Sequence, residues 1–304
     1  VPSPAATTTG ARILERSAFI EALPEDSAPC ELAPGGEAPQ VLMYTSGSTG
    51  RPKGAVLPHR KTLHNALNAE IFFELRERDV CVVPVPLFHS FGLKILSVPT
   101  LFCGGTVILV DRFDETGLQQ IVARYRGTLL GAVPTMYRRI LRAGIDPAAL
   151  SSLRIAFSAG APLDVDTIQA FAETGIAIMQ GYGQTETSIL CCLDPESAIR
   201  KAGSVGGRVR HGEVQISDSE GKPVPSGTTG EVLVRGPIVM SGYWRNPEGT
   251  AHSRINGWHR TGDLGQMDAE RYVTLVGRRE ELYISGGENV YPPEVERVLE
   301  SHPN

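Results

Sequence analysis

Cysteine, lysine and long apolar runs are scarce in this chain, and each scarcity excludes a class of protein. The five cysteines are odd in number and show no C-x-x-C spacing, which argues against a disulfide framework or a zinc site. A reducing, cytoplasmic setting fits them best. No run of about 18 apolar residues occurs, so we expect no transmembrane segment. Peripheral membrane contact and the oligomeric state stay open.

Positive charge is in the minority and comes mostly from arginine. The formal net charge is −5 with both signs mixed, whereas nucleic-acid binders carry a basic face, so we expect no nucleic-acid partner. The 304 residues, 41% of them hydrophobic, suffice for two or three domains. Only five lysines occur: Lys53, Lys61, Lys94, Lys201 and Lys222.

The N-terminal region predicts little regular structure. The start Val1-Pro2-Ser3-Pro4 has no initiating methionine and none of the basic or apolar stretches of a signal peptide, so we expect the chain to begin within a longer protein. Residues 1–40 are rich in Pro, Ala, Thr and Glu. They predict a partial N-terminal region of loop with one short helix near Ala11–Ile20.

Short apolar runs alternate with amphipathic stretches between residues 41 and 200. This alternation predicts βαβ units and therefore an α/β region of stacked, mostly parallel sheets flanked by helices. The expected buried strands are Val41–Thr45, Cys81–Pro86, Thr106–Val110, Thr128–Val133, Arg154–Ser158 and Ile176–Gln180. Two of the helices expected between them are Asp114–Tyr125 and Pro134–Arg142.

The pattern changes after residue 200. Residues 201–277 contain short strands separated by Gly, Pro and Asp turns, which predicts a small antiparallel β-barrel. Its expected strands are Glu213–Ser217, Glu231–Arg235 and Arg271–Leu275. Residues 278–304 predict a strand at Glu281–Ser285, a Gly-Gly turn and a helix at Pro292–Glu300, the start of a further α+β domain.

The segment Tyr44–Gly54, YTSGSTGRPKG, has the composition of a phosphate-binding loop. Its glycines, Gly47 and Gly50 among them, let backbone N–H groups approach an anion closely, and Lys53 adds a point charge. Four hydroxyl groups can donate to phosphate oxygens: Thr45, Ser46, Ser48 and Thr49. A flexible surface turn would explain a bare Gly/Ser loop, but it does not explain these eleven residues in this order.

This loop differs from a Walker A loop. That motif places Gly-Lys-Ser/Thr at the start of a helix, whereas here Pro52 precedes Lys53 and the following Gly54–Leu57 predicts a strand. The loop is therefore expected to cover the phosphates as a flap between two strands. In this form it resembles the signature loop of the adenylate-forming (AMP-dependent synthetase/ligase) superfamily.

From about Gln40 to its C-terminus the chain is similar to acyl-CoA synthetases of the fatty-acid–CoA ligase type. The resemblance implies a two-step reaction with ATP and CoA as co-substrates and Mg²⁺ as the cofactor. A carboxylic acid would attack the α-phosphorus of ATP to give acyl-AMP, and the acyl group would then pass to the thiol of CoA. A mobile C-terminal domain would swing between the two half-reactions.

A second motif, GYGQTET, spans Gly181 to Thr187 at the carboxyl end of an expected strand, where ligands bind in open α/β sheets. Tyr182 offers a face for adenine, and Glu186 is a hard oxygen ligand suited to Mg²⁺. A lone glutamate would more simply be a solvated surface carboxylate. The ATP-binding residues expected here are Gly181, Tyr182, Gly183, Gln184 and Thr185, the last at the α-phosphate.

A third motif, WHRTGDL, contains Asp263, which by the resemblance would bind the ribose hydroxyls; the alternative is a plain turn residue. In the following GRREE segment Arg278 would reach the ribose or a phosphate, and Glu280 stands where the family has its hinge. The family often has Lys or Asp at that hinge, and any flexible residue can absorb the rotation.

Weaker matches complete the expected site. His89 in PLFHSFG would orient the acid or control its access, although it could equally cap the next helix. By the resemblance, Gly160, Ala161 and Pro162 line the adenine pocket, or else form an ordinary strand-to-helix turn. The stretch assigned to CoA is Ser285, Gly286 and Gly287. The expected catalytic residues are therefore Thr45, Lys53, His89, Thr185 and Glu186, while Gly230–Pro237 and Gly242–Trp244 are assigned to the scaffold.

Two parts of the family pattern are missing. The family has well over a hundred residues before the phosphate loop and ends in a Gly-Lys motif, but no lysine follows Lys222 here. Loss of that positive charge at the transition state slows adenylation, so by itself the chain is expected to be weakly active or inactive.

Two alternative functions remain. The first is an amino-acid or aryl-acid adenylation domain that loads a carrier protein. The apolar pair Ile189-Leu190 and the lack of an Asp in His89–Gly92 instead favour a fatty or other apolar acid. The second alternative, from another class, is a nucleotide-binding fragment without turnover.

Overall fold

The computed structural model describes residues 35–45, 52–201, 203–281, 283–285 and 288–290, together with positions 292, 295 and 299. The chain divides into two compact units, Val1–Gly35 and Gly36–Asn304, and the described helices and strands belong to the second. The expected helix at Ala11–Ile20 lies outside the described residues, as does most of the one at Pro292–Glu300. Within the described part, no helix has the length and apolar character needed to cross a membrane.

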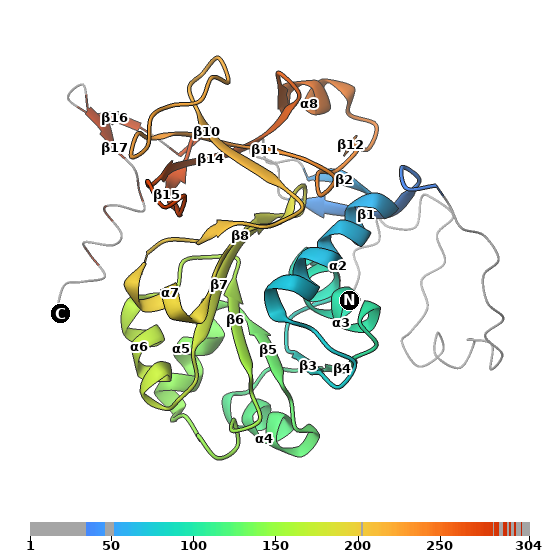
Figure 1. Cartoon of the computed structure of the whole chain (residues 1–304), viewed down its shortest axis with the longest axis vertical. Coiled ribbons are helices and arrows are strands. Elements are labelled where there is room, and N and C mark those ends of the chain that lie inside the picture. Colours follow the sequence, from blue (N-terminus) through green and yellow to red (C-terminus); the bar gives the residue numbers. More distant parts are fainter. Residues whose placement is uncertain are drawn as a thin grey trace, which may run out of the picture. The chain divides into compact units, whose positions relative to one another are not determined.

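A seven-stranded sheet forms the centre of the second unit, in the order β4-β3-β5-β6-β7-β8-β9 (Figure 1). Neighbours from β4 to β7 run parallel, whereas β7–β8 and β8–β9 are antiparallel. The strands are β3 (Val80–Val83), β4 (Thr106–Leu109), β5 (Leu129–Ala132), β6 (Ile155–Ala159), β7 (Ile178–Gln184), β8 (Ser188–Leu193) and β9 (Gly207–Arg208). This confirms the expected α/β class with a mostly parallel sheet.

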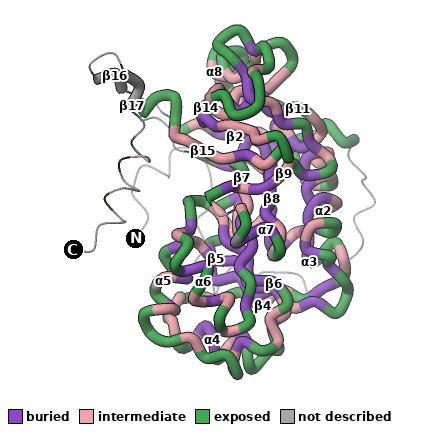
Figure 2. Tube along the Cα trace, turned by 60° about the vertical axis from the view of Figure 1, so that its left-hand side comes forward, coloured by how far each residue is buried: buried purple, intermediate pink, exposed green. Residues whose placement is uncertain are grey.

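Both faces of this sheet are covered, and successive strand residues point to opposite faces, so neighbouring residues enter different apolar clusters. Leu129 and Phe157 pack in one apolar cluster, and their neighbours Leu130 and Ala156 pack in another. The central strands are accordingly mostly buried in Figure 2, with β5 buried over its whole length. Figure 1 shows α5 and α6 on one side of the sheet and α2 on the other.

Local sequence explains where several helices begin. The Asp114 side chain accepts hydrogen bonds from the backbone N–H groups of Thr116 and Gly117 at the start of α4. Asp164 accepts one from the Thr167 N–H at the start of α6. Pro134 occupies the first turn of its helix. The helices are α2 (His59–Phe73), the π-helix η2 (Phe91–Ser97), α3 (Val98–Phe102), α4 (Glu115–Tyr125), α5 (Pro134–Ala143), α6 (Val165–Glu173), α7 (Pro195–Arg200) and α8 (Pro247–His252).

Among the described residues, three smaller sheets accompany the central one. Five antiparallel strands form the expected second sheet: β10 (Glu213–Ser217), β11 (Gly230–Arg235), β13 (Arg254–Ile255), β14 (Trp258–Met267) and β15 (Val273–Arg278). A three-stranded sheet joins β1 (Pro39–Thr45), β2 (Lys53–Pro58) and β12 (Gly242–Tyr243). The last two strands, β16 (Tyr283–Ser285) and β17 (Glu288–Val290), pair as a hairpin.

Two expected strands need correction, and one helix was missed. The strand at Val41–Thr45 was expected to be buried in the mostly parallel region, but it lies in a separate antiparallel sheet and only Met43 is buried. The strand expected to end at Gln180 continues to Gln184 as β7 and turns directly into β8, so the GYG part of the second motif belongs to a hairpin. The long helix α2 was not singled out from the sequence. The two strands expected on either side of the phosphate loop are confirmed, because β1 and β2 pair with Thr45 opposite Lys53, whereas the covering of phosphates by the loop stays a prediction. The division into parts at residues 40, 200 and 277 stays a prediction.

Candidate active site

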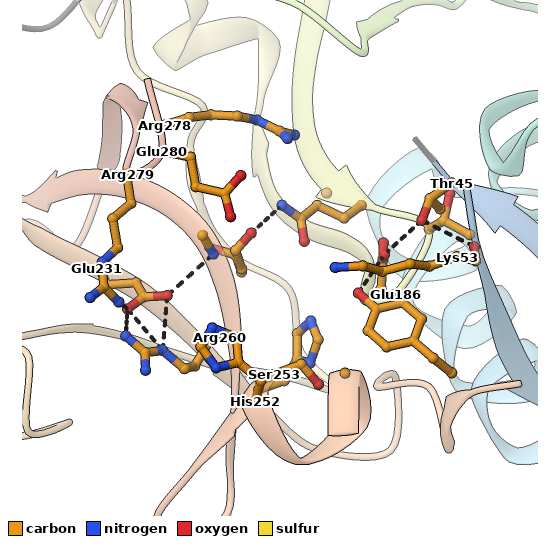
Figure 3. A pocket seen from close by; sticks show the side chains of 18 residues that line it. Thr45, Lys53, Glu186, Glu231, His252, Ser253, Arg260, Arg278, Arg279 and Glu280 are labelled. Atoms are coloured by element: carbon orange, nitrogen blue, oxygen red, sulfur yellow. Dashed lines mark hydrogen bonds and ion pairs between the residues drawn. The ribbon is translucent and has the colours of Figure 1, made fainter. Parts of the chain in front are cut away.

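A cavity of about 620 Å³ brings together residues from segments that lie far apart in the sequence. Its walls come from the facing ends of β1 and β2, the β7–β8 turn, β11, β12, α8, β14 and the segment after β15. The sequence-predicted residues that line it are Thr45, Lys53, Gly183, Gln184, Thr185, Glu186, Arg278 and Glu280. Figure 3 shows Thr45, Lys53 and Glu186 on one side of this cavity and Arg278, Arg279 and Glu231 on the other.

Glu186 joins the phosphate-loop strands to the β7–β8 turn. Its Oε1 accepts hydrogen bonds from Thr45 Oγ1 at 3.2 Å and from the Tyr243 hydroxyl at 3.0 Å, and the side chain is largely buried. Burial, together with the nearby Glu186 carboxylate, raises the pKa of Tyr243, so this phenol stays a donor. Both contacts use Oε1, which leaves Oε2 for a ligand such as Mg²⁺.

The phosphate loop is described only at its two ends. Lys53 lines the cavity and its Nζ lies 5.5 Å from the centre of the Tyr243 ring. The remaining predicted loop residues lie outside the described part of the chain: Ser46, Gly47, Ser48, Thr49 and Gly50.

A tight turn carries Thr185 and Glu186 into the cavity. The Thr187 N–H donates to the Gln184 carbonyl and the Gln184 N–H to the Thr187 hydroxyl, each at 3.1 Å. A Cβ at Gly183 would lie 1.9 Å from the carbonyl oxygen of Ser188, so only glycine fits there. Ser188 itself takes a left-handed φ of 61°, which few non-glycine residues adopt.

Asp263 connects the second and third motifs. Its Oδ2 accepts hydrogen bonds from the Tyr182 hydroxyl at 2.6 Å and Gln184 Nε2 at 2.7 Å, and Arg278 Nε lies 3.2 Å from Oδ1. Burial raises the pKa of Asp263, an effect that the bond from Tyr182 and the charge of Arg278 oppose. The structure therefore brings together four residues that the sequence predicts to bind the nucleotide.

Several residues of the cavity wall were missed or misassigned from the sequence. Glu231 and Tyr243 belong to stretches assigned to the scaffold, yet both line the cavity. Glu231 accepts from Arg260 Nη2 at 2.6 Å and from Arg279 Nη1 at 3.2 Å, so it holds two cations at the wall. Their position follows from long-range pairing, such as Tyr243 in β12 beside Ala55 in β2, which no local pattern reveals.

Gly181, Tyr182 and Asp263 lie outside the cavity lining, and so do the weaker sequence matches. His89 is exposed, with its ring 4.5 Å from that of Phe88, and the cap position of η2 is Ser90, without a side-chain cap bond. Gly160, Ala161 and Pro162 form an exposed turn after β6, and the preceding Ala159 pairs with Gly181 of β7. This pairing places the expected adenine stretch next to the second motif. The adenine role and the role of His89 stay predictions.

The stretch expected to contact CoA is described only in part. Ser285 ends β16, whereas Gly286 and Gly287 lie outside the described residues. Among the residues that are described, no three His, Cys, Asp or Glu side chains are grouped to hold a metal ion. A Mg²⁺ ion at Glu186 would take its other ligands from phosphates and water, as this ion commonly does.

Comparison with known proteins gives a consistent result. Residues 5–244 match the family model described as AMP-binding enzyme. The chain is 41% identical over 280 residues to feruloyl-CoA synthase from Amycolatopsis sp, covering 91% of this chain and 57% of that protein. The ATP-bound structure of MatB from Rhodopseudomonas palustris is 36% identical with a TM-score of 0.85, covering 91% of this chain and 55% of that one.

A further similar structure holds both ATP and a magnesium ion. It is O-succinylbenzoate coenzyme A synthetase (MenE) from Bacillus subtilis, which is 32% identical with a TM-score of 0.84 and covers 95% of this chain and 63% of that one. The chain thus spans little more than half the length of the curated relatives that it matches.

Proposed function

Because the chain belongs to the AMP-binding family of adenylate-forming enzymes, of the acyl-CoA ligase type, we propose that the whole protein is an AMP-forming acid–CoA ligase. In the first step a carboxylate oxygen of the acid attacks the α-phosphorus of ATP, and the bond to the bridging oxygen breaks to release pyrophosphate. In the second step the CoA thiol attacks the acyl carbonyl of acyl-AMP, and AMP leaves.

One observation supports this proposal most strongly: the β7–β8 turn touches both halves of the proposed nucleotide site. Glu186 at the turn bonds to Thr45 beside the phosphate loop, and Gln184 at its start bonds to Asp263. A nucleotide in this cavity would therefore meet hydroxyl groups and Lys53 at its phosphates and a carboxylate at its ribose. Such prior placement supplies catalysis by orientation and charge stabilisation, and it needs no protein nucleophile.

The residue roles follow the same geometry. Thr45, Lys53 and Thr185 would bind phosphate oxygens, and Glu186 would hold Mg²⁺, which neutralises charge on the phosphates. Asp263 would accept hydrogen bonds from the ribose hydroxyls, while Arg278 steadies its second oxygen. Arg260 and Arg279 add positive charge to the same wall.

The acid is proposed to be apolar, with aryl acids as the first class to test. Two of the similar proteins are named for aryl substrates, feruloyl-CoA synthase and O-succinylbenzoate coenzyme A synthetase. The sequence suggested a fatty or other apolar acid, and the names of these relatives make aryl acids the part of that class to test first.

The test is carboxylate-dependent exchange of labelled pyrophosphate into ATP by the whole protein, followed by thioester formation with CoA. A panel of aryl acids, fatty acids and amino acids supplies the substrates. Exchange with aryl or fatty acids and a CoA thioester as product would support the proposal. Exchange with amino acids only would indicate a carrier-loading adenylation domain, and no exchange with any acid would reject the ligase function.

A further inference from the structure

A polar stripe on α2 faces the protein interior. Lys61, Asn65 and Asn68 follow the i, i+4, i+7 spacing of one helix face, and each is at most 2% exposed. Asn65 donates to the Lys94 carbonyl and Asn68 accepts from the His211 N–H. Lys61 is the first of the three, and it alone reaches the β7–β8 turn.

Lys61 is a buried lysine whose hydrogen bond goes to a hydroxyl group. Its Nζ donates to the hydroxyl of Ser188, and it forms no ion pair with any residue that the structure describes. Taking an ammonium group out of water without an opposite charge is costly. Burial lowers the pKa of Lys61 to about 7, while the negative charge of Glu186 works in the other direction. A cost of this kind marks a group that serves the neighbouring site.

The acceptor of this bond closes the turn that carries Glu186. Ser188 is buried, adopts the left-handed φ of 61° and begins β8 directly after the turn. Only Thr187 separates it from Glu186 along the chain, and Thr185 lies just beyond. Fixing Ser188 therefore fixes the direction in which Glu186 and Thr185 enter the cavity.

We infer that Lys61 is a positioning residue for the proposed adenylation reaction, acting through Ser188 on the turn that presents Thr185 and Glu186 to Mg·ATP. This inference rests on the proposed function and adds a residue to it. Lys61 does not line the cavity, so its role is one of positioning. It supplies a buried hydrogen-bond donor beneath the turn and, in its protonated form, a positive charge.

Three variants of the whole protein test this role. Lys61→Met keeps a side chain of similar length but removes the charge and the hydrogen-bond donor. Lys61→Arg keeps both the charge and the donor. Ser188→Ala removes only the hydroxyl group that accepts the bond. Lys94→Met is the matched control, because Lys94 is also buried and bonds to Gln40 and Thr62 at 2.6 and 2.9 Å, away from the turn. The readouts are kcat, the KM values for Mg·ATP and for the acid, and the unfolding temperature.

Lys61→Met is expected to lower kcat/KM for Mg·ATP about 10- to 100-fold, the range for a lost hydrogen bond to a charged group. The KM for the acid should not change, and the unfolding temperature should hold or rise because a buried charge is gone. Lys61→Arg should recover most of the activity. Ser188→Ala should resemble Lys61→Met, and the double variant should lose no more than Lys61→Met alone.

Lys94→Met separates positioning from a general effect of burial. It is expected to change kcat/KM for Mg·ATP less than about threefold, as for a substitution away from the site. An equal loss in both methionine variants, or unchanged kinetics in Lys61→Met, would overturn the inference. The failure of each proposal gives a different result. If the wild-type protein shows no pyrophosphate exchange, the proposed function is wrong. If the wild-type protein and the Lys61 variants exchange pyrophosphate equally well, only the role of Lys61 is wrong.

Discussion

Glu186 sits where three segments meet, and its two hydrogen bonds come from neutral donors. Thr45 and Tyr243 both donate to Oε1, so an amide oxygen at this position could still accept them. What Glu186→Gln removes is the negative charge and the second carboxylate oxygen. The residue is thus suited to separate a structural role from a metal-binding role.

We expect Glu186→Gln to lower kcat/KM for Mg·ATP about 100- to 1,000-fold, in line with loss of one group that stabilises developing charge. The unfolding temperature should change little because the hydrogen bonds persist. Steady-state kinetics over a range of Mg²⁺ concentrations, with calorimetry for stability, provides the check. Unchanged kinetics would remove Glu186 from the metal site.

Asp263 does not line the cavity itself but lies behind its wall, bonded to Gln184 and paired with Arg278, which do line it. Asp263→Asn should weaken ATP binding about 10- to 100-fold, because the ribose hydroxyls lose a charged acceptor. Titration calorimetry with ATP in the absence of acid measures this directly. Asp268→Asn is the control, since Asp268 pairs with Lys201 outside the cavity, and it should bind ATP like wild type. Equal affinities in all three proteins would place the ribose elsewhere.

His259 is buried in β14, close to both Glu186 and Lys61. Burial lowers its pKa to about 4, whereas in the unfolded chain the pKa is about 6.5. Between these values the unfolded state binds a proton that the folded state rejects, so stability decreases as pH falls through this window, by about 3 kcal/mol in total. Denaturant unfolding from about pH 7.5 to pH 4 should show this slope in wild type.

His259→Gln is expected to flatten the same window because it removes the titrating group. The relevant quantity is the difference between the two proteins, since carboxylates contribute to both curves. Parallel curves for wild type and variant would show that His259 is not held neutral.

At the scale of elements, the β7–β8 hairpin depends on Gly183. An added Cβ would collide with the Ser188 carbonyl, so Gly183→Ala must shift the backbone and should destabilise the protein by about 2 kcal/mol or more. Gly207→Ala in β9 is the control, because a Cβ added there would have no other atom within 4 Å. Urea midpoints at constant m-value give the comparison. A similar midpoint in both variants would contradict this explanation of the turn.

Local patterns predicted most of the central sheet correctly. The apolar run at residues 128–133 produced β5, and Asp114 followed by an amphipathic stretch produced α4, because burial and capping are properties of neighbouring residues. The β7–β8 hairpin was harder to predict. Its strand continues through two glycines, a composition that local propensity assigns to a turn.

At the scale of the whole molecule, the candidate site could be predicted as motifs but not as a cavity. Thr45, Glu186 and Asp263 were identified from short motifs, and the structure connects them through the β7–β8 turn, while their roles stay predictions. Glu231 and Tyr243 were not, because they reach the cavity through pairing of β11 with β14 and of β12 with β2. Such contacts depend on the tertiary fold, and strand patterns alone do not encode them.

The chain covers little more than half the length of its curated relatives, which decides what each experiment needs. Its cavity is lined by Thr45, Lys53 and Glu186, and Gln184 of the lining bonds to Asp263, so these are the groups proposed to meet the nucleotide. The use of the acid and of CoA is therefore to be measured with the whole protein. Nucleotide binding, in contrast, depends on the site residues described here.

The most direct measurement is a crystal structure of the whole protein with Mg·ATP. We predict phosphates between Lys53 and Thr185, the metal ion on Glu186 and both ribose hydroxyls on Asp263. A nucleotide bound elsewhere, or bound here with its ribose away from Asp263 and its metal away from Glu186, would contradict the central claim.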